Sequence, residues 1–276
     1  MSKLKLFYNY INFFLKYFNI TLIRIKNSNQ QIFESLLNAK NNLSVNQNNK
    51  LYFSFFKYIL NNIHLSSSQR FQDLFVDWML QKKNGIFIEF GACDGINISN
   101  TYYLEKYMGW SGILLEPAKS WHNKIKFNRP NCIIDFRCVS DDSGNEVSFY
   151  ENIDPALSSL NNNFFSNTSY KVKTVSLNDI FFEYEEKLLK KSNEIESIDF
   201  ISIDTEGTEY QILKKFNFNK YSPKIIIVEH NFDPIKSKLL RELIEAHHYV
   251  NLFPELSAYD YFFVLKDVLL KRTNEE

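Results

Sequence analysis

Short apolar runs alternate with segments of helical periodicity from residue 85 onward. The runs have the length and composition of buried strands, and apolar spacings of three and four residues mark the intervening segments as helices. This alternation predicts an α/β fold with a mostly parallel sheet and helices on both faces. The expected strands cover residues 86–90, 112–116, 132–139, 146–151, 171–176, 198–203, 224–229, 248–253 and 259–265. Residues 152–170 are expected to be a loop that orders over substrate.

The chain before residue 85 has a different pattern. Residues 51–83 are helical in character, and Leu74, Phe75 and Trp78 lie on an apolar face that would cover the sheet. Residues 27–50 are rich in Asn, Gln and Ser, which is typical of a linker or a loosely packed helix. The expected organisation is an N-terminal helical extension and linker over residues 1–84, followed by one catalytic domain over residues 85–276.

Residues 1–26 mix apolar clusters with asparagine and lysine. No stretch reaches the roughly 20 uninterrupted apolar residues that a membrane span needs, and no small-residue cleavage site follows, as a secretory signal would require. An amphipathic helix remains. It would pack against the domain or a partner subunit, or lie at the inner face of a membrane.

Composition narrows the classes of partner. The 276 residues include 32 basic and 32 acidic side chains, so no whole-chain field attracts nucleic acid. The 45% hydrophobic content supports a substantial core. Three cysteines form no Cys-x-x-Cys motif and leave an odd thiol, which indicates a reducing, cytoplasmic compartment.

Two strand ends carry the pattern of a nucleoside site. The first strand continues into Glu89-x-Gly91-x-x-x-Gly95, and the second ends at Glu116. Glycines let a ligand approach the backbone, and an acid closing the second strand can accept hydrogen bonds from a ribose diol. Because the Gly-x-Gly-x-x-Gly of dinucleotide sites is missing, S-adenosylmethionine fits better than NAD.

A second group of polar residues follows two later strands. Asp204, Glu206 and Glu209 follow one strand, and Glu229 and His230 follow the next. Ligands bind at the carboxyl ends of strands in open α/β sheets, so three strands direct acids to one edge. Any one of these acids can instead be a solvated group or favour the first turn of a helix, as Glu209 can.

The chain from about residue 85 to residue 267 resembles the FkbM-type S-adenosylmethionine-dependent methyltransferases. The matching motifs run in the family's order: residues 87–95 (FIEFGACDG), 99–101 (SNT), 115–117 (LEP), 175–179 (VSLND), 203–209 (IDTEGTE) and 228–230 (VEH). The resemblance implies a Rossmann-like class I methyltransferase fold with an antiparallel last strand. It also implies O-methylation of a hydroxyl on a sugar, a glycan or a secondary metabolite. Phe90 and Cys93 depart from the family's more frequent residues.

The resemblance also implies roles for individual residues. Glu116 would bind the ribose, and Ser140 and Asp141 would flank the adenine. The remaining expected cofactor-binding residues are Glu89, Gly91, Ala92, Asp94, Gly95 and Asn100.

Deprotonation of an alcohol acceptor points to a second set of residues. An alcohol is a weak nucleophile, so a base or a metal would help remove its proton. Asp204, Glu206 and His230 are the candidates for that role, although a strand-end histidine is often structural. Asp204, Glu206, Glu229 and His230 offer ligands suited to magnesium or manganese, but their spacing alone predicts no metal site.

Two other functions fit the same pattern. The domain could bind S-adenosylmethionine or a glycan without turnover, as a module of a biosynthetic assembly. It could also be an NAD-dependent sugar oxidoreductase, which the missing glycine motif disfavours. The acceptor and the oligomeric state are not determined by strand ends.

Overall fold

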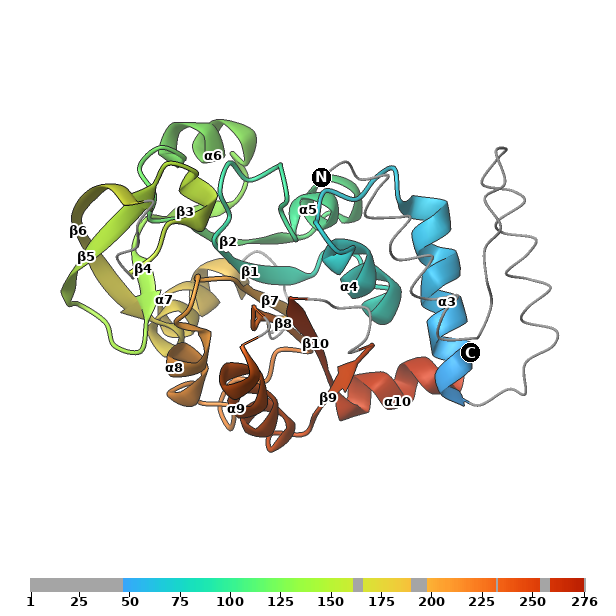
Figure 1. Cartoon of the computed structure of the whole chain (residues 1–276). Helices are drawn as coiled ribbons and strands as arrows, with labels where there is room; N and C mark the ends of the chain where they lie inside the picture. Colours follow the sequence, from blue (N-terminus) through green and yellow to red (C-terminus); the bar gives the residue numbers. More distant parts are fainter. Residues whose placement is uncertain (1–46, 161–165, 190–197, 232, 254–258, 276) are drawn as a thin grey trace, which may run out of the picture. The chain divides into compact units, whose positions relative to one another are not determined.

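The computed structural model describes residues 47–160, 166–189, 198–231, 233–253 and 259–275 (Figure 1). The chain divides into two compact units, Met1–Asn61 with Glu276, and Asn62–Glu275. The described part of the first unit is residues 47–61 of helix α3 (Gln47–Asn62). The second unit takes in α4 (Gln72–Leu80), which precedes the domain start expected at residue 85. The amphipathic helix expected over residues 1–26 lies outside the described residues.

Seven strands form the central sheet of the second unit. They are β1 (Ile86–Phe90), β2 (Ser111–Leu115), β3 (Ile133–Asp135), β7 (Phe200–Ile203), β8 (Ile225–Glu229), β9 (Tyr249–Leu252) and β10 (Asp260–Leu265). Their order is β3-β2-β1-β7-β8-β10-β9, and β10 is antiparallel to both neighbours while the other pairs are parallel. This confirms the Rossmann-like fold with an antiparallel last strand. The order reverses between β1 and β7, where open α/β sheets bind ligands.

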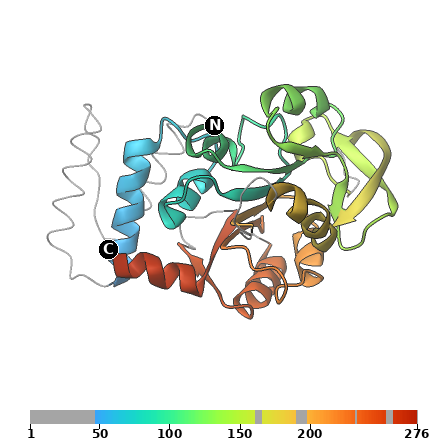
Figure 2. The ribbon, with the colours of Figure 1, turned by 180° about the vertical axis from the view of Figure 1, so that it is seen from behind.

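Helices cover both faces of this sheet, as the alternation predicted (Figures 1 and 2). The helices of this unit after α4 are α5 (Tyr102–Met108), α6 (His122–Asn128), α7 (Leu177–Leu189), α8 (Glu209–Lys214), α9 (Pro234–Glu245) and α10 (Lys266–Glu275). Alternate strand residues such as Ile88 and Ile226 share one buried core with side chains of α7, α8 and α9. On the opposite face the ring of Phe75 in α4 lies 4.8 Å from that of Phe262. Of the described helices, none is long and apolar enough to span a membrane.

A second, three-stranded sheet corrects two expectations. Its strands are β4 (Cys138–Ser140), β5 (Glu146–Asn152) and β6 (Ser166–Ser176), in the order β4-β6-β5. The expected single strand 132–139 is wrong, because the Asp135 carboxylate accepts hydrogen bonds from the backbone amide and guanidinium of Arg137 and the chain turns there. The second half then pairs in parallel with β6.

The long loop expected over residues 152–170 is also wrong at both ends. Asn152 belongs to β5, and residues 166–170 belong to β6. Between them Pro155–Leu157 form a 3₁₀ turn, η1, and the Ala156 amide at its start donates to the Asp154 side chain. Residues 161–165 lie outside the described part. The stretch between the two strands is therefore shorter than the expected loop, and its described part, residues 153–160, contains η1.

Candidate active site

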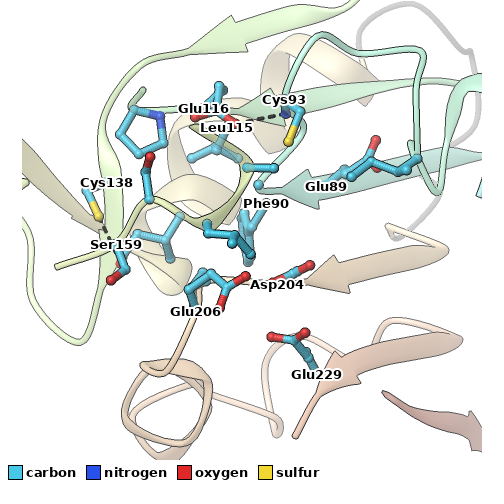
Figure 3. A pocket seen from close by; sticks show the side chains of 18 of the residues that line it. Glu89, Phe90, Cys93, Leu115, Glu116, Cys138, Ser159, Asp204, Glu206 and Glu229 are labelled. Carbon is cyan, nitrogen blue, oxygen red and sulfur yellow. Dashed lines mark hydrogen bonds between the residues drawn. The ribbon is translucent and has the colours of Figure 1, made fainter. Parts of the chain in front are cut away.

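A cavity of about 380 Å³ lies at the carboxyl ends of β1, β2, β7 and β8. Each of these strands contributes lining residues where it ends, as expected for an open α/β sheet. The small sheet and η1 supply another wall through Cys138, Phe149 and Leu157. Figure 3 shows the Glu116 side of the cavity facing the carboxylates of Asp204, Glu206 and Glu229.

The loop after β1 depends on a glycine. Gly91 has φ +68°, and a Cβ placed there would lie 2.5 Å from the backbone oxygen of Asp204. The Gly91 amide donates to the carbonyl of Leu115 at 3.1 Å, which fixes the loop against β2. Only glycine combines this backbone conformation with this close approach. The loop therefore runs along the cavity without a side chain in the way.

Glu116 is buried, with 4% of its surface exposed, and it lines the cavity. One carboxylate oxygen accepts a hydrogen bond from the Cys93 amide and the other from the Ala118 amide, both at 2.8 Å. Burial, with Glu151 and Asp204 nearby, raises the pKa of Glu116 to about 8 against the effect of these two hydrogen bonds. In the charged form each oxygen keeps a lone pair for a ligand hydroxyl, and hydrogen bonds from such hydroxyls favour that charged form.

Asp204, Glu206 and Glu229 lie together at the carboxyl ends of β7 and β8, a convergence that their sequence spacing alone did not predict. One carboxylate oxygen from each lies within 4.8 Å of the others, so the three could hold a divalent cation. A side-chain hydrogen bond joins Asp204 to Glu229. Burial and the neighbouring acids raise the pKa of both, and the pair therefore shares a proton when no cation is present. Burial, followed by Asp204, raises the pKa of Glu206 to about 7.

Glu209 binds the backbone on both sides of Glu206. It is fully buried, and one of its carboxylate oxygens accepts the amides of Thr205 and Gly207, both at 3.0 Å. Its other oxygen pairs with the ammonium of Lys236. Glu206, between Thr205 and Gly207, has φ 55°, an uncommon conformation for a residue with a side chain. Glu209 thus holds the strained turn that presents Glu206 to the cavity.

His230 is placed differently from the three acids. Glu229 ends β8 and lines the cavity, as Asn231 does, whereas His230 between them is outside its lining. The His230 Nδ1 lies 3.0 Å from the Ser237 hydroxyl, and the ring packs against Tyr261. Burial, followed by Lys236, lowers the pKa of His230. The structure gives it contacts on the far side of the strand, and its catalytic role stays a prediction.

The expected cofactor residues divide into two groups. Those that line the cavity are Glu89, Gly91, Asn100 and Glu116, and those outside its lining are Ala92, Asp94, Gly95, Ser140 and Asp141. Asp94 caps its own loop by accepting the amides of Ile96 and Asn97. Asp141 pairs with Lys215 at 3.1 Å. The cofactor-binding roles of both groups stay predictions.

Gln72 and Asp260 also line the cavity, and neither was a candidate from sequence. Gln72 of α4 donates from Nε2 to Asp260 of β10 at 3.0 Å, across 188 positions of the chain. Burial, followed by Asp204, raises the pKa of Asp260 to about 7. An antiparallel strand starts at the edge where parallel strands end. The expected antiparallel direction of the last strand could therefore have indicated that Asp260, its first residue, lies at the cavity. Gln72 gave no such signal.

Comparison with known proteins gives one family. A model of the methyltransferase FkbM domain matches residues 89–261. No curated protein matches. The chain is similar to an O-methyltransferase from Bacillus cereus in complex with SAH, at 15% identity and TM-score 0.38, over 77% of this chain and 90% of that one. It is also similar to precorrin-6y C5,15-methyltransferase from Geobacter metallireducens GS-15, at 11% identity and TM-score 0.36, over 70% and 85%.

Proposed function

The chain belongs to the FkbM methyltransferase family, and we propose that it transfers the methyl group of S-adenosylmethionine to a hydroxyl of a sugar, a glycan or a secondary metabolite. The observation that carries the proposal is Glu116, a buried carboxylate at the end of β2 that lines the cavity beside the glycine loop. A ribose diol donates two hydrogen bonds, and this carboxylate is placed to accept them.

The residues present fit S-adenosylmethionine. Gly91 lets the backbone of the loop approach the end of β7 with no side chain between them, and the cavity of about 380 Å³ suits a nucleoside-sized ligand. The carboxylates that line it suit a ligand bearing a sulfonium and an ammonium charge. When bound, the cofactor supplies an electrophilic methyl group. The Cys93 thiol also lines the cavity, but burial and neighbouring carboxylates raise its pKa, so it remains protonated.

The protein's own task is alignment and exclusion of water. Phe90, Leu115 and Val139 give the cavity an apolar floor, which limits water near the reacting atoms. Alignment in a preorganised site can account for much of the acceleration of an in-line displacement. The fixed strand ends therefore matter more to this reaction than a strong nucleophile in the protein.

Asp204 and Glu229 are the groups we assign to the acceptor's proton. Their side chains share one proton, so the pair has an oxygen free to accept a second one from a hydroxyl. Gln72, Asn231, Tyr259 and Asp260 line the same end of the cavity. Amide, phenol and carboxyl groups hydrogen-bond to hydroxyls, which supports a polyhydroxylated acceptor at this end.

Calorimetric titration of the full chain tests the proposal. The ligands are S-adenosylmethionine, S-adenosylhomocysteine and NAD, followed by an assay for S-adenosylhomocysteine formed with sugar acceptors. We expect micromolar binding of the first two ligands, no binding of NAD, and product with at least one hydroxylated acceptor. Binding without turnover over a broad acceptor panel would support a non-catalytic binding module. Preferred binding of NAD would support an oxidoreductase instead.

A further inference from the structure

Arg129 is fully buried although it does not line the cavity. One terminal nitrogen of its guanidinium donates to the Gly95 carbonyl at 2.8 Å and to the Ser99 hydroxyl at 3.2 Å, and the other donates to the Thr101 hydroxyl at 3.1 Å. Its Nε pairs with the Glu105 carboxylate. A buried guanidinium is costly unless its donors are satisfied. Most of the hydrogen bonds that this guanidinium donates go to one segment, residues 95–101.

Glu89 binds the same segment from the sheet side. Its carboxylate accepts the Asn100 amide at 2.6 Å, the Ser99 hydroxyl at 3.0 Å and the Thr101 hydroxyl. The hydroxyls of Ser99 and Thr101 therefore contact the carboxylate of Glu89 and the guanidinium of Arg129 at once. Burial raises the pKa of Glu89, and the positive charge of Arg129 is the largest effect that opposes this rise. We call these two residues and the two hydroxyls the Glu89–Arg129 network.

The segment held by this network is strained. Ile98 has φ 59°, a left-handed conformation that a β-branched residue rarely adopts. Such conformations persist only where the surrounding structure imposes them. Ile98 and Asn100 line the cavity, and Ile98 is 43% exposed at that position. The strain therefore falls where the segment forms the cavity wall.

We propose that Arg129 is a positioning residue for ligand binding: through the Glu89–Arg129 network it holds residues 95–101 in the strained conformation that forms one wall of the cavity. This inference rests on the proposed function for the identity of the ligand. It assigns no contact between Arg129 and the ligand.

Glu105 provides a matched control. Glu89 and Glu105 are both carboxylates paired in charge with Arg129, but only Glu89 accepts hydrogen bonds from residues 99–101. Glu105→Gln removes a charge beside Arg129 and leaves the segment's hydrogen bonds in place. Glu89→Gln removes a charge and loosens the segment itself.

The experiment compares the full-length wild type with Arg129→Met, Arg129→Lys, Glu105→Gln, Glu89→Gln and the Glu89→Gln/Arg129→Met double variant. Hydrogen exchange of residues 95–101 is measured without ligand, and the affinity for S-adenosylhomocysteine is measured by calorimetry. Circular dichroism and thermal unfolding identify the variants that fold. The double variant removes both charges, which makes it a folded alternative if Arg129→Met alone does not fold.

We expect Arg129→Met to accelerate exchange of residues 95–101 selectively and to weaken S-adenosylhomocysteine binding at least tenfold. Arg129→Lys keeps the charge but not the planar set of donors, so its exchange rate and its affinity should lie between those of Arg129→Met and the wild type. The affinity of Glu105→Gln for S-adenosylhomocysteine should stay within threefold of the wild-type affinity. When Glu89→Gln is already present, adding Arg129→Met should weaken S-adenosylhomocysteine binding by less than a further threefold, because the network is already broken.

A pH series separates positioning from general stability. Without Arg129, Glu89 takes up a proton more readily and loses acceptor capacity, so the affinity deficit of Arg129→Met should shrink as the pH rises. A folded Arg129→Met variant with wild-type exchange in residues 95–101 would overturn the inference, and so would fully additive effects in the double variant. If the wild type itself binds no S-adenosylhomocysteine, the proposed function fails, while the exchange data still decide on the network.

Discussion

The carboxylate of Glu116, at the end of β2, accepts a hydrogen bond of 2.8 Å from the backbone amide of Cys93, in the loop after β1 (Figure 3). The side chain that faces the ribose position therefore also fixes the glycine loop. Cys93 has φ 49°, so the loop is held in an uncommon conformation at that residue. Binding and loop geometry depend on the same carboxylate, and an experiment on Glu116 has to separate the two.

Glu116→Gln and Glu116→Ala should both weaken S-adenosylhomocysteine binding by roughly 10–100-fold, since each hydrogen bond to a charged group contributes about 1.5–3 kcal/mol. Glu116→Ala should also lower the free energy of unfolding, by about 1–3 kcal/mol, because the Cys93 and Ala118 amides both lose their acceptor. Glu116→Gln should lower it less, because its one carbonyl oxygen still accepts from one of the two amides. Calorimetry and thermal unfolding measure the two effects. Glu146→Gln, at an exposed position of β5, is the control. Wild-type affinity in Glu116→Gln would contradict the ribose contact.

Gly91→Ala should destabilise the protein by about 2–4 kcal/mol and weaken cofactor binding at least tenfold, because its Cβ would meet the Asp204 carbonyl. Gly144→Ala is the matched control. Gly144 also has positive φ, +81°, but nothing lies within 4 Å of its added Cβ, so it should cost only about 1 kcal/mol. Chemical denaturation measures both. Equal costs at the two positions would mean that close approach at Gly91 is unimportant.

Asp204→Asn should lower turnover by roughly 10²–10⁴-fold, the usual contribution of a positioned base, while S-adenosylhomocysteine affinity changes only a few-fold. His230→Gln should lower turnover by less than about tenfold, because its ring lies outside the cavity lining. The assay is single-turnover product formation with an acceptor identified by screening. A larger loss in His230→Gln than in Asp204→Asn would reverse this assignment.

The raised pKa of Asp260 makes the free energy of unfolding depend on pH. Burial, followed by the charge of Asp204, raises its pKa from the ordinary value of 3.8 to about 7 in the folded protein. Its contribution to stability is therefore fully present below about pH 4 and is lost as the pH rises through 7. Asp260→Asn removes this loss and keeps an oxygen for the Gln72 amide. The variant should match the wild type near pH 4 and be more stable by about 2–4 kcal/mol at pH 8. Denaturation across this range measures the difference, with exposed Asp142→Asn as control. A pH-independent difference would show that Asp260 does not titrate in this way.

The sequence located most strands because each is a short buried apolar run. β1 has the expected bounds and β8 differs by one residue at its start. The strand expected over 132–139 failed because no local pattern shows that the Asp135 carboxylate turns back onto Arg137. The assignment of β4 to the small sheet depends on pairing with β6, more than thirty residues later.

The site divides in the same way. Gly91, Glu116 and the acids after β7 and β8 could be found from sequence, because parallel strands deliver their carboxyl ends to one edge. Gln72 could not, since its place opposite Asp260 is set by the packing of α4. No sequence motif includes Arg129, and only the fold shows its guanidinium among Gly95, Ser99 and Thr101.

The sequence by itself determined the α/β alternation, the family and the strand-end acids, because these follow from hydrophobic periodicity and from motifs contained within single strand-loop units. Tertiary structure decided which of those acids share a proton, which face His230 takes, and which residues hold the loop between β1 and α5. These properties depend on distances between side chains far apart in the chain and on burial, which sets their charge states. Neither quantity is defined until the sheets and helices pack.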